Sequence, residues 1–223
     1  MKGSNGKVIT HQTVTEWLKT NHIEGKYLVS MHKIINTYWS KMMYMPAARF
    51  HHSNYRGGLA NHTANVMRHA LNLSSVYPEV DRDEIVFLAM AHDLGKLDCY
   101  MMNGYHVKST AHMDHIFTTI LRLQMIGILL TPEQMKAIVG HHGGWTIDKS
   151  LKHNIESILL HTADMLACQD ESKIAKLLPE DLIEETNEVS IQSTHLEPKR
   201  GSVNSGSTYP KTGIAVPREG ISL

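Results

Sequence analysis

The chain has 223 residues, enough for one compact domain and a tail but short for two full-sized domains. Its 22 Lys and Arg balance its 22 Asp and Glu, which excludes an overall charge that would attract nucleic acid or an anionic membrane. Hydrophobic residues make up 42% of the chain, too many for a disordered protein, and no apolar run reaches the roughly 18 residues of a membrane span. Two cysteines and an N-terminus without a signal-peptide pattern favour a cytoplasmic protein without a disulfide framework.

Helical periodicity dominates the first 180 positions. Apolar residues recur every three or four positions and alternating β-branched runs are nearly absent, which predicts an all-α fold. We expect helices over residues 13–19, 27–45, 59–75, 81–91, 110–127, 151–168 and 171–178, and one more that begins at Thr131–Pro132–Glu133–Gln134 and stops at Gly143–Gly144. Asp81 with Glu84, and Thr131 with Gln134, have the spacing of capping boxes.

The composition changes toward the C-terminus. From Gly201 onward, 13 of 23 residues are Gly, Ser, Thr, Asn or Pro, which bury too little apolar area to offset the entropy of ordering the chain. We therefore expect one domain over residues 1–180 and a linker with a flexible tail over 181–223.

Histidine is the unusual residue type, with 16 in the chain. It is a common metal ligand and carries a proton near neutral pH. The pair His92–Asp93 directly follows the apolar segment 85–91. An imidazole and a carboxylate are costly to bury without partners, and a divalent cation can satisfy both, whereas the alternative is a buried hydrogen-bonded pair.

Further histidines lie beside expected core positions on other helices. His62 opens one helix, His112 and His115 lie three apart on another, His161 and Asp164 lie three apart on a third, and His141–His142 end a fourth. A single such histidine is more often a hydrogen-bonded core residue than a ligand. Five or more histidines and two aspartates are hard to satisfy pairwise, and a metal cluster satisfies them together.

In this order the residues resemble the HD-domain superfamily of metal-dependent phosphohydrolases, whose pattern is a histidine, a His–Asp doublet and a distant aspartate. The blocks most similar to the catalytic domain of bacterial HD-type 3′–5′ exoribonucleases are His51–His52 with Tyr55–Leu59 and His62–Thr63, His92–Lys96, Asp114–Ile116, His141–Gly143 and Leu160–Ala167. HD-type conjugative relaxases carry a related block of His-His, Gly-Gly-Leu and His-Thr. The resemblance covers about residues 46–170 and implies an HD-domain helical bundle.

The resemblance also implies roles for particular residues. One metal ion would be held by His62, His92, Asp93 and Asp164, and a second by His115 and His141, with His142 as an additional ligand. Asp93 would bridge the two ions as a catalytic residue. His112 is the alternative to His115 as a ligand of the second ion. We expect His112 and His161 to lie beside the ligands. Lys96 would contact a phosphate oxygen or the leaving group, the alternative being a solvated lysine after a helix.

The chain also departs from the relatives that it resembles. The 45 residues before Pro46 are helical in pattern and too few for the oligonucleotide-binding barrel that precedes the domain in the exoribonucleases. Ala167 stands where that family usually has an acidic residue. Gly143–Gly144–Trp145 lacks the Gly-Tyr-Pro element of the cyclic dinucleotide phosphodiesterases, which disfavours cyclic di-GMP as a substrate.

The expected ligands indicate the chemistry. Imidazole and carboxylate suit manganese or iron, with nickel, cobalt or zinc as further candidates, and we expect two divalent ions. Two such ions with two aspartates leave the pocket with a charge of about +2, which attracts a phosphate-bearing substrate. A metal can lower the pKa of bound water from about 15.7 to about 7. In the polar loop before His62, Arg56 is a candidate for binding phosphate, and Tyr55 or His52 for binding base or sugar.

The sequence therefore predicts a metal-dependent phosphohydrolase or phosphodiesterase that acts on a nucleotide or a nucleic-acid end. Two alternatives remain open: an HD-fold di-iron oxygenase, which uses a similar order of ligands, and a non-catalytic HD module that binds a nucleotide. We expect no membrane association, and the sequence indicates no obligate protein partner.

Overall fold

The computed structural model describes residues 8–49, 53–103, 106–109, 115–145 and 150–170. Helices and turns of helix make up most of these residues, which confirms the expected all-α bundle. The elements are α1 (His11–Thr20), α2 (Gly25–Ile34), a π-helical turn η1 (Ile35–Trp39), α3 (Ser40–Met42), α4 (Gly58–Ser74), α5 (Arg82–Ala91), α6 (Lys96–Cys99), β1 (Tyr100–Asn103), β2 (His106–Ser109), α7 (His115–Met125), α8 (Pro132–Gly140), a 3-10 turn η2 (Gly143–Trp145) and α9 (Ile155–Asp170).

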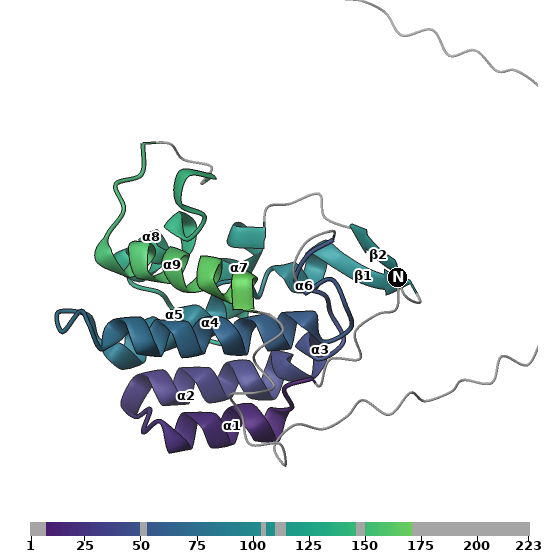
Figure 1. Ribbon diagram of the computed structural model, residues 1–223, viewed down its shortest axis with the longest axis horizontal. Helices are drawn as coiled ribbons and strands as arrows, with labels where there is room; N and C mark the ends of the chain where they lie inside the picture. The colour runs from purple at the N-terminus through teal and green to yellow at the C-terminus, as the bar shows by residue number, and fades with distance from the viewer. Residues whose placement is uncertain (1–7, 50–52, 104–105, 110–114, 146–149, 171–223) are drawn as a thin grey trace, which may run out of the picture. The chain divides into compact units, whose positions relative to one another are not determined.

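The helices pack in layers around α4 and α5. Helix α4 contacts both α5 and α9, α2 contacts α5, and α8 contacts α9. Figure 1 shows α1 and α2 along one side of the α4–α5 pair, and α8 and α9 along the opposite side. Helix α5 is thereby enclosed by other helices.

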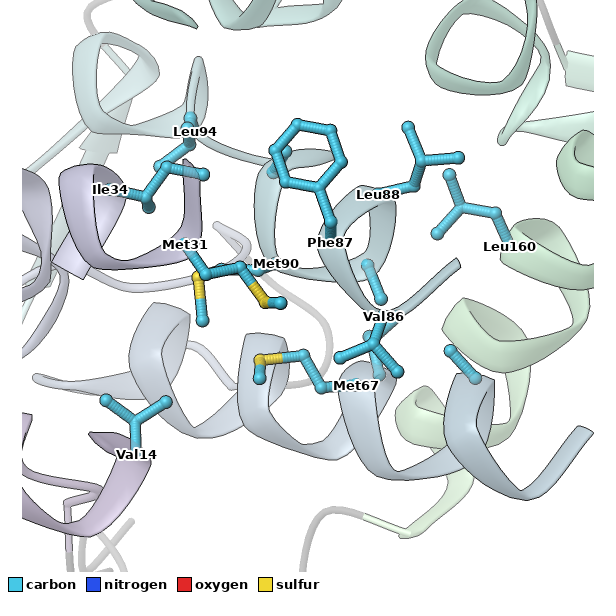
Figure 2. Close-up of a cluster of buried hydrophobic side chains, with 14 of the residues drawn as sticks. Val14, Met31, Ile34, Met67, Val86, Phe87, Leu88, Met90, Leu94 and Leu160 are labelled. Carbon is cyan, nitrogen blue, oxygen red and sulfur yellow. The ribbon is translucent and has the colours of Figure 1, made fainter. Parts of the chain in front are cut away.

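The apolar segment 85–91 forms the centre of the core. Each of its residues is at most 1% exposed. Figure 2 shows Phe87 and Met90 of this segment among side chains from other helices, including Met31, Met67 and Leu160. Burying one large apolar side chain stabilises a fold by roughly 1.5–3 kcal/mol. Because α5 runs through the interior, the residues that follow it, His92 and Asp93, are also in the interior.

The predicted helix caps are present. The side chain of Asp81 accepts hydrogen bonds from the backbone N–H groups of Asp83 and Glu84, and Thr131 forms a complete capping box with Gln134. The side-chain amide of Gln134 also donates to the carboxylate of Glu84, 2.7 Å away. This bond joins the start of α8 to the start of α5.

Some boundaries differ from the expected ones. The helix expected over 27–45 is interrupted by the π-helical turn, and α8 ends at Gly140 rather than at Gly143–Gly144. Helix α9 begins at Ile155 rather than at Leu151 because the side chain of Asn154 accepts a hydrogen bond from the backbone N–H of Ser157.

A two-stranded antiparallel hairpin supplements the helical bundle. Strands β1 and β2 pair from Tyr100 with Ser109 to Asn103 with His106.

Three expected segments lie wholly or partly outside the described residues. They are the first five residues of the helix expected over 110–127, the helix expected over 171–178, and the linker and tail over 181–223. Within the described part of the chain, none of the helices combines the length and the apolar character that a membrane crossing requires.

Candidate metal centre

Five helices bring the expected ligands to one place. His62 lies on α4, His92 and Asp93 follow α5, His115 begins α7, His141 and His142 follow α8, and Asp164 lies on α9. Each of these five helices packs against at least one of the others: α4 contacts α5 and α9, and α8 contacts α5, α7 and α9. The seven residues therefore approach one another through tertiary packing, although they are spread over more than a hundred positions of the sequence.

The first group of donor atoms surrounds His62. Its Nε2 lies 3.0 Å from Oδ1 of Asp164 and 3.5 Å from Oδ2 of Asp93. One potential ligand atom from each of His62, His92 and Asp164 lies within 4.8 Å of the other two. This spacing allows the three side chains to contact a common ion.

The second group contains the histidines of α7 and of the segment after α8. Potential ligand atoms of His115, His141 and His142 also lie within 4.8 Å of one another. Asp93 lies between the two groups: its Oδ1 is 3.6 Å from Nε2 of His115, and its Oδ2 is 3.2 Å from Nε2 of His92. The two carboxylate oxygens thus face different groups, as a bridging carboxylate requires.

Backbone hydrogen bonds fix the orientation of two buried rings. Nδ1 of His92 lies 2.8 Å from the carbonyl oxygen of Ala89, and Nδ1 of His141 lies 2.6 Å from that of Ile138. A carbonyl oxygen only accepts, so each Nδ1 donates and Nε2 is the ring nitrogen left to bind at the cluster. Among the described residues, the buried Nε2 of His141 has no hydrogen-bond partner. A cation would satisfy this nitrogen, so the residues present fit a metal ion.

The electrostatics of the cluster favour the metal-binding forms of His141, His142 and Asp93. Burial lowers the pKa of His141 well below its usual value, and the charges of His92 and His142 lower it further. Burial also lowers the pKa of His142. Burial alone would raise the pKa of Asp93, but His92 and Lys96 outweigh it and hold that pKa well below its usual range. Neutral imidazoles and an ionised carboxylate are the ligand forms at neutral pH.

His62 and Asp164 form a tight pair. Burial would lower the pKa of His62, but its hydrogen bonds to Asp164 and Asp93 raise it overall. Burial would raise the pKa of Asp164, but the hydrogen bond and charge of His62 lower it below its usual value. The two carboxylates thus favour the protonated form of His62, which a metal ion would have to displace.

Lys96 contacts the cluster directly. Its Nζ lies 2.7 Å from Oδ2 of Asp93, and its side chain is only 14% exposed, which excludes the alternative of a solvated lysine. Burial would lower its pKa, but the charge of Asp93 raises that pKa above its usual value. Lys96 therefore remains a cation beside the donor atoms.

His161 lies next to the cluster on α9. Its Nδ1 donates to the carbonyl oxygen of His141 over 2.7 Å. Its ring also lies against Gly143, where a Cβ would come within 2.8 Å of Nε2 of His161. His161 thus supports the segment that carries His141 and His142. The other histidine expected beside the ligands, His112, lies outside the described residues.

The loop before α4 brings two backbone segments close together. Gly57 has a φ of +82°, and a Cβ at Gly58 would lie 2.0 Å from the carbonyl oxygen of Ser53. The hydroxyl of Tyr55 accepts a hydrogen bond from Asn61 over 3.2 Å, and the guanidinium of Arg56 stacks on the exposed ring of Tyr44 at 4.3 Å. The third loop residue expected at the substrate, His52, lies outside the described residues.

Sequence reasoning missed several groups around the cluster. Thr119 of α7 is buried and hydrogen-bonds to the turn that contains His92 and Gly95. Tyr100 is also near: burial raises its pKa, while the charges of Lys96 and Arg49 act in the opposite direction. Gly95, two residues after Asp93, is a signal in the sequence for a close backbone contact. Nothing in the sequence indicates which residue makes that contact.

Together the fold and the cluster define a helical protein with a candidate metal site. Its sequence is similar to the dihydroneopterin 2′,3′-cyclic phosphate phosphodiesterase of Methanocaldococcus jannaschii, with 28% identity over 127 residues, 53% of this chain and 49% of that protein. It is also similar to the 3′-5′ exoribonuclease YhaM of Bacillus velezensis, with 29% identity over 86 residues, 39% of this chain and 27% of that protein. YhaM of Listeria welshimeri matches over 52 residues with 40% identity, 23% of this chain and 17% of that protein.

No protein-family model matches the chain, and no solved structure matches it. The chain spans about half the length of the first of these relatives and about a quarter of the second. The comparisons thus support a relationship to phosphoester hydrolases at modest identity and over part of the chain.

Proposed function

We propose that this chain is a metal-dependent phosphohydrolase or phosphodiesterase that hydrolyses a phosphoester of a nucleotide or of an oligonucleotide end. The observation that carries this proposal is the position of Asp93 between two groups of histidines, with one carboxylate oxygen toward each. The relatives named as a phosphodiesterase and as exoribonucleases support the same class of reaction.

The two groups of donor atoms suggest which residues hold which ion. His62, His92 and Asp164 would hold one ion, and His115, His141 and His142 the other, with Asp93 shared. Mixed imidazole and carboxylate donors favour manganese or iron over magnesium or calcium, which prefer oxygen donors. When bound, the ions supply the Lewis acidity that activates water and neutralises charge on a phosphoryl oxygen.

Lys96 supplies a protein cation for the same reaction. Its ammonium group is already in contact with Asp93 and is largely buried. An ammonium in this position can bind a phosphate oxygen of the substrate and stabilise the negative charge that develops on it. Lys96 would therefore act on the substrate itself, together with the metal ions.

We infer the substrate class from the charge of a metal-loaded site and from the loop that precedes α4. A cationic pocket attracts an anionic phosphate group. Arg56 would bind a second phosphate, and Tyr55 or His52 would contact the base or sugar. The exposed Arg56–Tyr44 pair offers a flat cationic surface of the kind on which a nucleobase can stack.

A screen of metal ions against substrates tests the proposal. The purified full chain is freed of metal, reloaded with manganese, iron, zinc or magnesium, and incubated with nucleotides, 2′,3′-cyclic nucleotides, short RNA and DNA, and aryl phosphates. We expect manganese-supported release of phosphate or of mononucleotides under nitrogen, and none from the Asp93→Asn variant.

Two outcomes would contradict the proposal. Consumption of dioxygen that strictly requires iron, without phosphate ester cleavage, would assign the site to an oxygenase. Tight nucleotide binding without turnover by the metal-loaded protein would assign it to a binding module.

A further inference from the structure

A hydroxyl of α7 lies beside the turn that follows α5. Thr119 has no exposed surface, and its Oγ1 lies 2.8 Å from the backbone nitrogen of Gly95 and 3.1 Å from the carbonyl oxygen of His92. The hydroxyl accepts from the N–H of Gly95 and donates to the carbonyl of His92. One side chain thus spans the turn on both sides of Asp93.

Some backbone groups of this turn bond within it, such as the N–H of Lys96 to the carbonyl of Asp93, whereas the N–H of Gly95 and the carbonyl of His92 bond to Thr119. The last carbonyl groups of a helix have no partner within that helix, and this helix ends in the interior, away from water. Buried backbone groups therefore need a partner from another element, and Thr119 supplies it from α7. The link joins two elements that both carry candidate ligands.

Thr119 is also placed to fix the position of His115. The two residues are four apart on α7, so they lie on the same face of that helix, one turn from each other. The carbonyl oxygen of His115 in turn occupies the space where a side chain at Gly95 would lie. Helix α7 therefore touches the turn at two points, and the second brings Nε2 of His115 to within 3.6 Å of Asp93.

We propose that Thr119 is a positioning residue of the metal centre, whose hydroxyl holds α7 against the turn after α5 and so holds His115 beside Asp93. The inference rests on the proposed metal-dependent function, because it assumes that these residues bind an ion. It adds a residue that does not itself contact the ion but sets the spacing between two of its ligands.

The test measures binding of Mn²⁺ to the full chain, by titration and by metal content after dialysis against a chelator. Thr119→Val keeps the shape of the side chain and removes the hydroxyl, whereas Thr119→Ser keeps the hydroxyl. We expect Thr119→Val to bind Mn²⁺ about 10-fold more weakly or worse, a loss typical of residues that orient metal ligands. Thr119→Ser should bind like the unchanged protein.

Thr13→Val is the matched control. Thr13 is buried on α1, which carries no candidate ligand, and its hydroxyl lies 3.0 Å from that of Thr10. A purely structural role of Thr119 predicts that both valine variants lower the melting temperature of the metal-free protein and leave Mn²⁺ affinity unchanged. That result would overturn the inference. If Thr119→Val does not fold, Thr119→Ala tests the same hydroxyl under the same criterion.

The outcomes separate the two proposals. If the unchanged protein binds no Mn²⁺, the metal-dependent function fails and the inference fails with it. If the unchanged protein binds Mn²⁺ and Thr119→Val binds it equally well, only the role of Thr119 fails.

Discussion

The backbone of His115 occupies the place where a side chain of Gly95 would lie. A Cβ at position 95 would come within 1.9 Å of the carbonyl oxygen of His115, closer than any two such atoms can approach. The first residue of α7 therefore sits directly on the turn that carries His92 and Asp93. The proximity of His115 to Asp93 depends on the absence of a side chain between them.

This contact predicts the effect of a small substitution. Gly95→Ala must displace the backbone at His115, and overpacking of this kind costs about 1–3 kcal/mol of stability. We expect weaker metal binding in addition, because His115 moves away from Asp93. Chemical denaturation and metal analysis of the purified variant measure the two effects.

Gly144→Ala serves as the control for that substitution. A Cβ at Gly144 would meet nothing within 4 Å. Its stability and metal content should stay close to those of the unchanged protein. Equal behaviour of the two variants would show that the contact between Gly95 and His115 is not essential.

Asp93 is predicted to be essential for metal binding and for catalysis. Asp93→Ala removes the carboxylate that faces both groups of histidines. We expect loss of bound metal and of phosphoester hydrolysis, with the helical circular dichroism signal retained because the apolar side chains that pack the helices together are unchanged. Full activity of Asp93→Ala would refute its bridging role.

Lys96 is predicted to affect catalysis more than metal binding. Lys96→Met retains much of the aliphatic chain and removes the charge 2.7 Å from Asp93. Loss of one donor to a developing negative charge typically costs about 100-fold or more in kcat. Steady-state kinetics should show this loss while metal analysis shows a content close to that of the unchanged protein.

Lys96→Arg is the companion variant. It keeps the charge but changes the geometry, so its activity should lie between that of Lys96→Met and the unchanged protein. Unaltered kcat in Lys96→Met would remove Lys96 from the reaction.

Metal removal is predicted to destabilise the fold. An ion that binds only the folded chain stabilises it by about 2.7 kcal/mol at a concentration 100 times its dissociation constant. We expect the purified protein to contain close to two transition-metal ions, and a chelator to lower its melting temperature. Re-addition of Mn²⁺ should restore the temperature, and metal analysis that finds no ion after gentle purification would count against the centre.

Mn²⁺ should stabilise a variant that lacks one candidate ligand less than it stabilises the unchanged protein. His141→Ala removes a buried ring whose Nε2 faces the other donors. The increase in melting temperature on adding Mn²⁺ should therefore be smaller in His141→Ala than in the unchanged protein. An equal increase in both proteins would place the bound ion elsewhere.

The sequence by itself determined the helical class and the residues to examine. Helical periodicity is a local property, so the cores of α4, α5 and α7 and the cap at Thr131 could be predicted from neighbouring residues. The candidate ligands could be named because a polar residue beside an apolar helical face needs a partner. Their convergence agrees with that prediction, and their role as ligands stays a prediction.

Only the tertiary structure decided how the candidate ligands and the residues around them are spaced. The π-helical turn after α2, the start of α9 at Ile155 and the hairpin of β1 and β2 were not predicted, because each depends on local geometry that apolar periodicity does not encode. The bonds of Thr119 to His92 and Gly95 join residues more than twenty positions apart. Such contacts are set by how whole helices pack, so no pattern along the chain reveals which hydroxyl will meet which turn.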